Sequence, residues 1–150
     1  MKIISHRGNI SGPDTALENN PAYIAEALKL GFDVEIDVWY TGNGFYLGHD
    51  DPMYNVDQTF LLNEKLWCHA KNLRALYQLM EIGAHCFWHE QDRVTITSLG
   101  YVWCYPNTNE FNSKSIALCF DADKKIPTNC YGVCTDYPNR ITKIYDNVGN

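Results

Sequence analysis

Short apolar segments alternate with helical segments along this chain, and this alternation restricts its fold more than any other feature. The segments with a strand pattern are residues 2–5, 32–40, 45–47, 66–70, 85–89, 101–105, 115–120 and 131–135. The segments with a helical pattern are residues 21–30, 73–82 and, near the end, 139–145. Strand–helix–strand alternation favours parallel pairing, so the sequence predicts an α/β fold.

Local signals mark the ends of the two main helices. Asn20 can cap the first helix, Pro21 fits its first position and Gly31 can end it. Asn72 can cap the second helix in the same way. Residues 41–44 are expected to form a tight turn between two strands.

The length of the chain limits how this pattern can close. The sequence has 150 residues, which favours one domain over residues 1–150, whereas a full (β/α)8 barrel usually needs about 250 residues. The second half is too short to give every strand its own helix. We therefore expect a reduced TIM-type (β/α) barrel with several outer helices shortened or missing. Alternatively, the chain forms a homo-oligomer, such as a dimer, in which the second copy covers the exposed flank. An open doubly wound sheet is the alternative.

The charge and hydropathy of the chain exclude several classes of partner. The formal net charge is -6, which argues against nucleic acid and against an anionic membrane surface. No apolar stretch reaches the length of about 18 residues that suggests a membrane span. The six cysteines form no CxxC pair and lie mostly in apolar runs. We interpret them as buried reduced thiols in a cytoplasmic protein, with disulfides or a zinc site as the alternatives.

One face of the strand at residues 32–40 carries Asp33, Glu35 and Asp37 in alternation with apolar residues. Carboxylates this close repel one another, and burying them without partners is costly. A divalent cation would resolve both problems. A solvent-exposed strand face, or ion pairs with Arg and Lys, would also explain the pattern.

Other polar residues follow the predicted strands at their carboxyl ends. In a parallel α/β fold these ends lie together on one face, which is where active sites form. The residues that we therefore expect to converge are His6, Arg7, Glu35, Asp37, His49, His69 and Lys71. A single histidine is more commonly structural, but three at strand ends beside acids and bases favour a catalytic site.

This ordered set of motifs resembles the glycerophosphodiester phosphodiesterase family, within the wider group of phospholipase-C-like barrels. The segments that carry the resemblance are His6-Arg7-Gly8, residues 17–20, Glu35-Ile36-Asp37, Gly48-His49-Asp50 and residues 133–138. The resemblance is close over residues 2–52, moderate at 66–72 and 131–139, and poor between them. It implies a hydrolase of lipid metabolism whose partner is a small-molecule phosphodiester of the glycerol type.

The resemblance also implies roles that the residue chemistry supports. His6 and His49 would act as general acid and base. Arg7 and Lys71 would bind the phosphate, and a metal on Glu35 and Asp37 would neutralise its charge. In similar enzymes the substrate's own hydroxyl attacks first and gives a cyclic phosphate. The alternatives are a lyase that stops at this cyclic product and a non-catalytic module that binds phosphate and metal.

The chain departs from the family at the third strand. The family usually carries a Glu two residues before the Lys, and here that position is His69. We expect a divalent metal held by Glu35, Asp37 and His69; among Mg²⁺, Ca²⁺, Mn²⁺ and Zn²⁺, the imidazole suits Mn²⁺ or Zn²⁺ better than Ca²⁺. Alternatively, His69 packs or hydrogen-bonds near an empty site.

The second half offers further polar residues without a clear role. His89, Glu90 and Asp92 follow a predicted strand and could be ligands, substrate contacts or a plain polar loop. Asp121 follows another strand and is expected in a solvated loop. Asp136 is expected to cap the final turn, with no catalytic role.

Overall fold

The computed structural model describes residues 1–42, 44–123 and 125–148. The first strands are β1 (Lys2–His6), β2 (Asp33–Thr41), β3 (Gly44–Leu47), β4 (Tyr54–Val56) and β5 (Leu66–Ala70). The later strands are β6 (Cys86–Trp88), β7 (Val94–Ile96), β8 (Val102–Cys104), β9 (Ser115–Leu118) and β10 (Gly132–Thr135). The helices are α1 (Pro21–Lys29), α2 (Gln58–Leu61), α3 (Leu73–Glu81) and α4 (Pro138–Val148).

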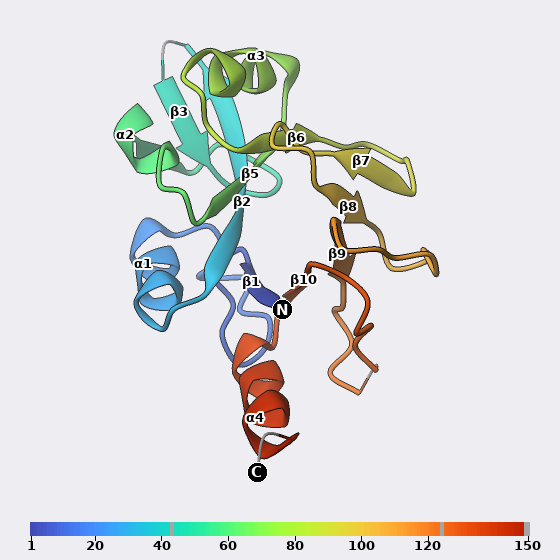
Figure 1. The fold of residues 1–150 in the computed structure, drawn as a ribbon. Helices are drawn as coiled ribbons and strands as arrows, with labels where there is room; N and C mark the ends of the chain where they lie inside the picture. Colours follow the sequence, from blue (N-terminus) through green and yellow to red (C-terminus); the bar gives the residue numbers. More distant parts are fainter. Residues whose placement is uncertain (43, 124, 149–150) are drawn as a thin grey trace.

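All of these strands belong to one curled sheet (Figure 1). Its parallel strands follow the spatial order β6, β5, β2, β1, β10, β9 and β8, so the first and last strands of the chain pair with each other. The antiparallel strands β3 and β4 extend the sheet beyond β2, and β7 pairs with β8. The fold is therefore mixed α/β with few helices. The alternation of strands and helices along the sequence predicted the α/β class.

The register of β2 determines which polar residues meet. Glu35 lies beside His6 of β1, and Asp37 lies beside His69 of β5. On the opposite face of β2, Val34, Ile36 and Val38 are fully buried with residues of α1 and α3. Burying this apolar face against the helices therefore turns the carboxylates toward the inner, concave side of the sheet.

Helix signals were predicted correctly where side chains cap the backbone. The Asn20 side chain accepts a hydrogen bond from Ala22 N, and the Asn72 side chain accepts one from Ala75 N. The sequence patterns did not reveal β4, α2 or β7, which are short and do not lie in an apolar run. The expected turn at 41–44 includes Asn43, which lies outside the described residues.

Helices are distributed unevenly around the sheet (Figure 1). α1 packs on β2, and α3 packs on β2, β5 and β6, whereas β7, β8 and β9 are joined by loops. Among the described residues, no helix combines the length and hydrophobicity that crossing a bilayer requires.

Candidate functional site

A cavity of about 680 Å³ opens at the carboxyl ends of the parallel strands. One side is formed by the residues that the sequence predicted to converge, namely His6, Arg7, Glu35, His49, His69 and Lys71. The other side is formed by residues 89–93 and 105–108, with Trp103, Leu118 and Phe120. His6 and His49 therefore face one cavity, as a shared catalytic role requires.

Asp37 connects the charged groups behind the cavity wall. Its side chain is fully buried and lies 2.9 Å from Arg7 Nε, 3.1 Å from His69 Nδ1 and 3.4 Å from Lys71 Nζ. Asn19 Nδ2 also donates to Asp37 Oδ2 at 3.0 Å. Burial alone would raise the pKa of Asp37, but the hydrogen bond with His69 and the charges of Arg7 and Lys71 outweigh it, so the pKa is lowered. Asp37 is therefore ionised.

Glu35 lies in the opposite electrostatic situation. Burial and the charge of Asp37 raise its pKa. Its Oε2 atom is 3.9 Å from His6 Nε2 and has no hydrogen-bond partner among the described residues. A buried carboxylate oxygen without a partner costs free energy unless something binds it. This oxygen is therefore free to contact a ligand, and the group to which it belongs could hold a metal ion.

His69 completes a group of three metal-binding side chains. Its Nδ1 atom faces Asp37 Oδ1 at 3.1 Å and Glu35 Oε1 at 3.8 Å, while its Nε2 atom faces His89 O at 3.4 Å. One ligand atom from each of Glu35, Asp37 and His69 lies within 4.8 Å of the others. Nδ1 of His69 is hydrogen-bonded to Asp37 Oδ1. To bind a metal, Nδ1 would give up this hydrogen while Nε2 donates to the carbonyl of His89, and the Nδ1 lone pair and the two carboxylates would then surround one cation.

The backbone of Arg7 is adapted to the site. Arg7 has a φ angle of 55°, in the left-handed region that residues with a side chain seldom adopt. Its N–H donates to Glu35 O at 2.8 Å, and its carbonyl accepts from Asn19 N at 3.0 Å. Its Nη1 atom donates to Glu18 Oε2 at 3.0 Å. These contacts hold the guanidinium over Asp37, at the cavity wall.

His6 is oriented by a residue to which the sequence assigned only a structural role. Asp136 was expected to cap the final turn, but its Oδ1 atom lies 2.7 Å from His6 Nδ1 and accepts from Asn9 Nδ2 at 2.8 Å. Burial would lower the pKa of His6, but the bond with Asp136 and the charge of Glu35 outweigh it and raise the pKa. With Nδ1 held by Asp136, Nε2 of His6 is directed toward the cavity side.

His49 lies at the rim of the cavity and is less constrained. Its side chain is 43% exposed, and its Nδ1 atom lies 2.7 Å from Asp50 Oδ1. The loop depends on Gly48, which has a φ angle of 151° and whose added Cβ would lie 2.0 Å from Asp51 O. Only glycine fits this turn, which precedes His49 at the cavity.

The residues with open roles divide into two groups. His89, Glu90 and Asp92 line the cavity, and the His89 ring stacks on Tyr105 with centroids 3.4 Å apart. Asp121 lies elsewhere, beside a small cavity that it shares with Ile126 and Ile141. The sequence argument missed Asn9 and Asp136, and gave no individual role to Glu18 and Asn19. Only the motif at residues 17–20 indicated that the last two mattered.

Comparison of the chain with protein-family models, with curated proteins and with solved structures finds no match. Any assignment of function therefore rests on the geometry of the site and on the motifs. The geometry defines a buried group of two carboxylates and one imidazole, two adjoining cations and two histidines that share one cavity.

Proposed function

We propose that this protein is a metal-dependent phosphodiesterase that hydrolyses a glycerol-type phosphodiester with His6 and His49 as its acid–base pair. The observation that carries the proposal is the unpartnered Glu35 Oε2 within the group of Glu35, Asp37 and His69, on the same cavity as both histidines. A structural charge cluster would satisfy this oxygen with a donor of its own.

The three side chains fit a divalent metal. Two carboxylates and an imidazole suit Mn²⁺ or Zn²⁺, and Mg²⁺ is compatible with the carboxylates. The bond from His69 Nε2 to His89 O is the outer contact that metal-binding histidines commonly make. A bound metal would supply Lewis-acid stabilisation of negative charge on the phosphate oxygens.

The remaining chemistry belongs to residues of the chain. Arg7 and Lys71 hold the phosphate by its non-bridging oxygens. His6 Nε2 faces the cavity while Asp136 holds Nδ1, so His6 exchanges a proton through one defined nitrogen. His49 exchanges the second proton from the rim, where its Nδ1 atom is bonded to Asp50. One histidine activates the attacking hydroxyl of the substrate and the other protonates the leaving alkoxide, which gives a cyclic phosphate. Water then adds to this phosphate and the ring P–O bond breaks, with the two histidines exchanging roles.

Further features belong to the same proposal. We interpret the curled sheet as a reduced TIM-type barrel, because consecutive parallel strands are neighbours and β1 pairs with β10. The buried thiols of Cys68, Cys86 and Cys134 agree with a reducing, cytoplasmic location. Association of copies through the flank of β7 to β9, which has no helices, stays a prediction.

Turnover of glycerophosphoglycerol, which carries a neighbouring hydroxyl and an alkoxide leaving group, with Mn²⁺, Zn²⁺ or Mg²⁺ tests the proposal. We expect metal-dependent hydrolysis that His6→Ala and His49→Ala each reduce by about 100-fold or more. Chromatography of products from glycerophosphoglycerol separates a hydrolase from a lyase, because a lyase accumulates the cyclic phosphate. Thermal stabilisation by metal and phosphate without turnover would identify a binding module and overturn the enzyme assignment.

A further inference from the structure

The outer face of α3 differs from that of α1, the other helix that covers the first half of the sheet. Leu73, Tyr77 and Met80 are 51%, 60% and 60% exposed, and their spacing of four and three residues places them in one stripe along α3. The exposed positions of α1 carry alanine, glutamate or lysine. Single exposed apolar side chains are ordinary, but a connected stripe of large ones is typical of an interaction surface.

The fold itself does not account for this stripe. The opposite side of α3 packs on β2, β5 and β6, where Ala75 and Leu79 are fully buried. The stripe faces away from this contact, because α3 lies on the outside of the sheet (Figure 1). Two apolar faces on one short helix therefore indicate a second packing partner.

The charges beside the stripe show what kind of partner fits. Arg74 is exposed at the start of α3 and Glu81 is exposed at its end. They are seven residues apart, which is about two helical turns, so both lie on the same side of the stripe. In the part of the chain that the structure describes, neither forms an ion pair, and Glu81 Oε2 accepts a hydrogen bond from Gln78 Nε2 at 3.0 Å.

A helix with opposite charges at its two ends is complementary to a second copy of itself in the antiparallel direction. Around a twofold axis at Tyr77, Leu73 of one copy faces Met80 of the other. The same operation places Arg74 against Glu81 of the second copy, and each contact occurs twice, as an interface between identical faces requires. A parallel arrangement would place like charges opposite each other, which is unfavourable.

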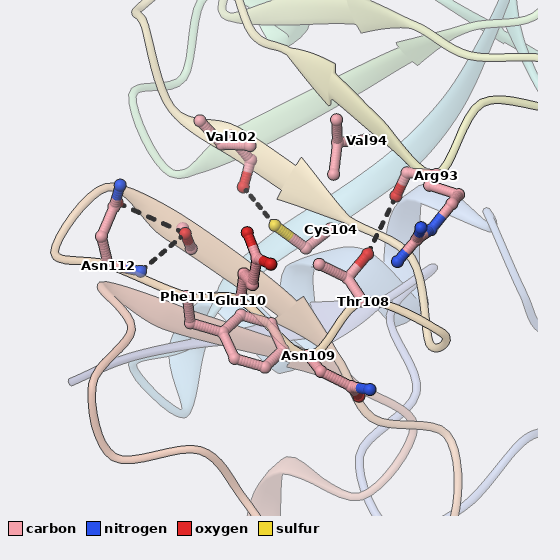
Figure 2. A pocket seen from close by; sticks show the side chains of 10 residues that line it. Arg93, Val94, Val102, Cys104, Thr108, Asn109, Glu110, Phe111 and Asn112 are labelled. Carbon is pink, nitrogen blue, oxygen red and sulfur yellow. Dashed lines mark hydrogen bonds between the residues drawn. The ribbon is translucent and has the colours of Figure 1, made fainter.

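The flank of β7 to β9, where the sequence suggested a second copy, does not show this complementarity. Figure 2 shows that its outer side is hollowed by a cavity of about 650 Å³, with Val102, Cys104 and Ser115 in its lining. A second copy would need a projecting segment to fill this hollow. Two identical helices, in contrast, pack directly against each other.

We propose that this protein forms a reversible homodimer through the outer face of α3. The two helices are antiparallel, Tyr77 lies at the twofold axis, and Arg74 of each copy pairs with Glu81 of the other. Because α3 has nine residues, the interface is small and the Kd should be on the order of 10 µM. The inference does not depend on the proposed reaction, since among the described residues those of α3 do not line the cavity of the candidate site.

Sedimentation velocity of the whole chain, from tenfold below to tenfold above this Kd, tests the proposal. We expect the sedimentation coefficient to rise from that of a monomer to that of a dimer. Tyr77→Glu places a charge at the centre of the interface and should raise the Kd at least about tenfold. The position is 60% exposed, so the variant should fold. Ala25→Glu is the matched control, because it adds the same charge to the exposed side of α1 and should leave the Kd unchanged.

Reversal of the two charges tests the antiparallel direction. Arg74→Glu and Glu81→Arg each place like charges opposite each other, so each alone should raise the Kd by about 3- to 10-fold. The double variant restores opposite charges and should restore the wild-type Kd. Both changes suit the helix dipole, with an acid at the start and a base at the end, so a weaker dimer would not result from a weaker helix.

The other outcomes each overturn the inference. A wild-type protein that stays monomeric over the whole range forms no such dimer. A dimer that persists in Tyr77→Glu uses another face, such as the flank of β7 to β9. Failure of the double variant to restore the Kd excludes the antiparallel pairing. Monomeric protein that sediments with phosphatidylcholine vesicles, and loses this property in Tyr77→Glu, would assign the stripe to a lipid surface.

Discussion

The two halves of the curled sheet differ in construction and in what they contribute to the cavity. In the first half, β1, β2 and β5 have five to nine residues each, and α1 and α3 cover their outer side. In the second half, β7, β8 and β9 have three or four residues and are joined by loops. The first half supplies the buried charges, whereas the second supplies a wall of loop residues.

This difference follows from what each set of residues has to do. Carboxylates buried beside one another need partners at fixed distances, and paired strands with a covered outer face provide them. A wall that contacts the variable part of a ligand can consist of loops, which accept changes in sequence without loss of the core. We infer that the chemistry belongs to the first half and the selectivity to the second.

The largest effect is expected for Glu35→Gln. Because burial and Asp37 raise the pKa of Glu35, a neutral amide of the same shape should be tolerated in the metal-free protein. Turnover should fall on the order of a thousandfold, since a ligand and a local charge are lost. Wild-type protein should gain about 2.7 kcal/mol of stability at a metal concentration 100 times Kd, and the variant should gain little.

Glu64→Gln is the matched control for this substitution, because Glu64 is exposed in the loop before β5. It should retain both turnover and the metal-induced rise in Tm. Unchanged metal binding by Glu35→Gln, measured by titration calorimetry, would contradict the assignment of the metal site.

A comparison of one strand substitution in each half tests whether the halves also differ in stability. Ile36 of β2 is fully buried, so Ile36→Ala should lower the free energy of unfolding by about 2–5 kcal/mol. Val94 of β7 is 43% exposed, so Val94→Ala should cost about 0.5 kcal/mol or less. Urea denaturation measures both, and equal losses would show that the second half is packed as firmly as the first.

The sequence predicted the longer elements and their caps better than the shortest elements and the long-range contacts, for a physical reason. Strand alternation at β2 and the caps at Asn20 and Asn72 are local patterns, and the structure confirms them. β7 is short, and Asp136 reaches His6 only because β10 pairs with β1, a contact between residues 130 positions apart. No local period records such a contact. The motifs nevertheless identified the residues on one side of the cavity before the fold was known.

Asp136→Asn tests the connection between the last strand and the first. Replacing the carboxylate by an amide weakens the bond that holds His6 Nδ1, so kcat should fall by about 10- to 100-fold while KM changes little. Nitrogen-15 shifts of the His6 ring should show a change in tautomer population. Unchanged ring shifts together with an unchanged kcat would mean that Asp136 does not position His6.

The contact of His85 with Thr97 lies between the two halves of the sheet, and the pKa of His85 makes the stability of the fold depend on pH. His85 precedes β6, and its Nε2 atom is bonded to Thr97 Oγ1 at 2.9 Å. Burial, only partly opposed by the charge of Asp33, lowers the pKa of His85 to about 4, against about 6.5 in an unfolded chain. Between these values the unfolded chain binds more protons, so the His85 contribution is complete above about pH 6.5 and decreases as the pH falls toward 4.

The wild-type protein should therefore lose about 1–2 kcal/mol more of its free energy of unfolding between pH 7 and pH 4.5 than His85→Gln does. His89→Gln, in the loop beside the cavity, serves as the control and should follow the wild-type curve. Identical pH profiles for wild type and His85→Gln would show that the ring is solvated and does not hold the halves together.

The smallest effect is expected for Asp50→Asn, and this variant is compared with Asp136→Asn. Both aspartates lie 2.7 Å from Nδ1 of a proposed catalytic histidine. The Asp50 side chain is 87% exposed and that of Asp136 is 10% exposed, so water can replace the first contact and cannot readily replace the second. Asp50→Asn should lower kcat less than about threefold. A loss as large as that of Asp136→Asn would mean that the rim closes over substrate and buries the contact between His49 and Asp50. His49 would then depend on its carboxylate partner as strictly as His6 does.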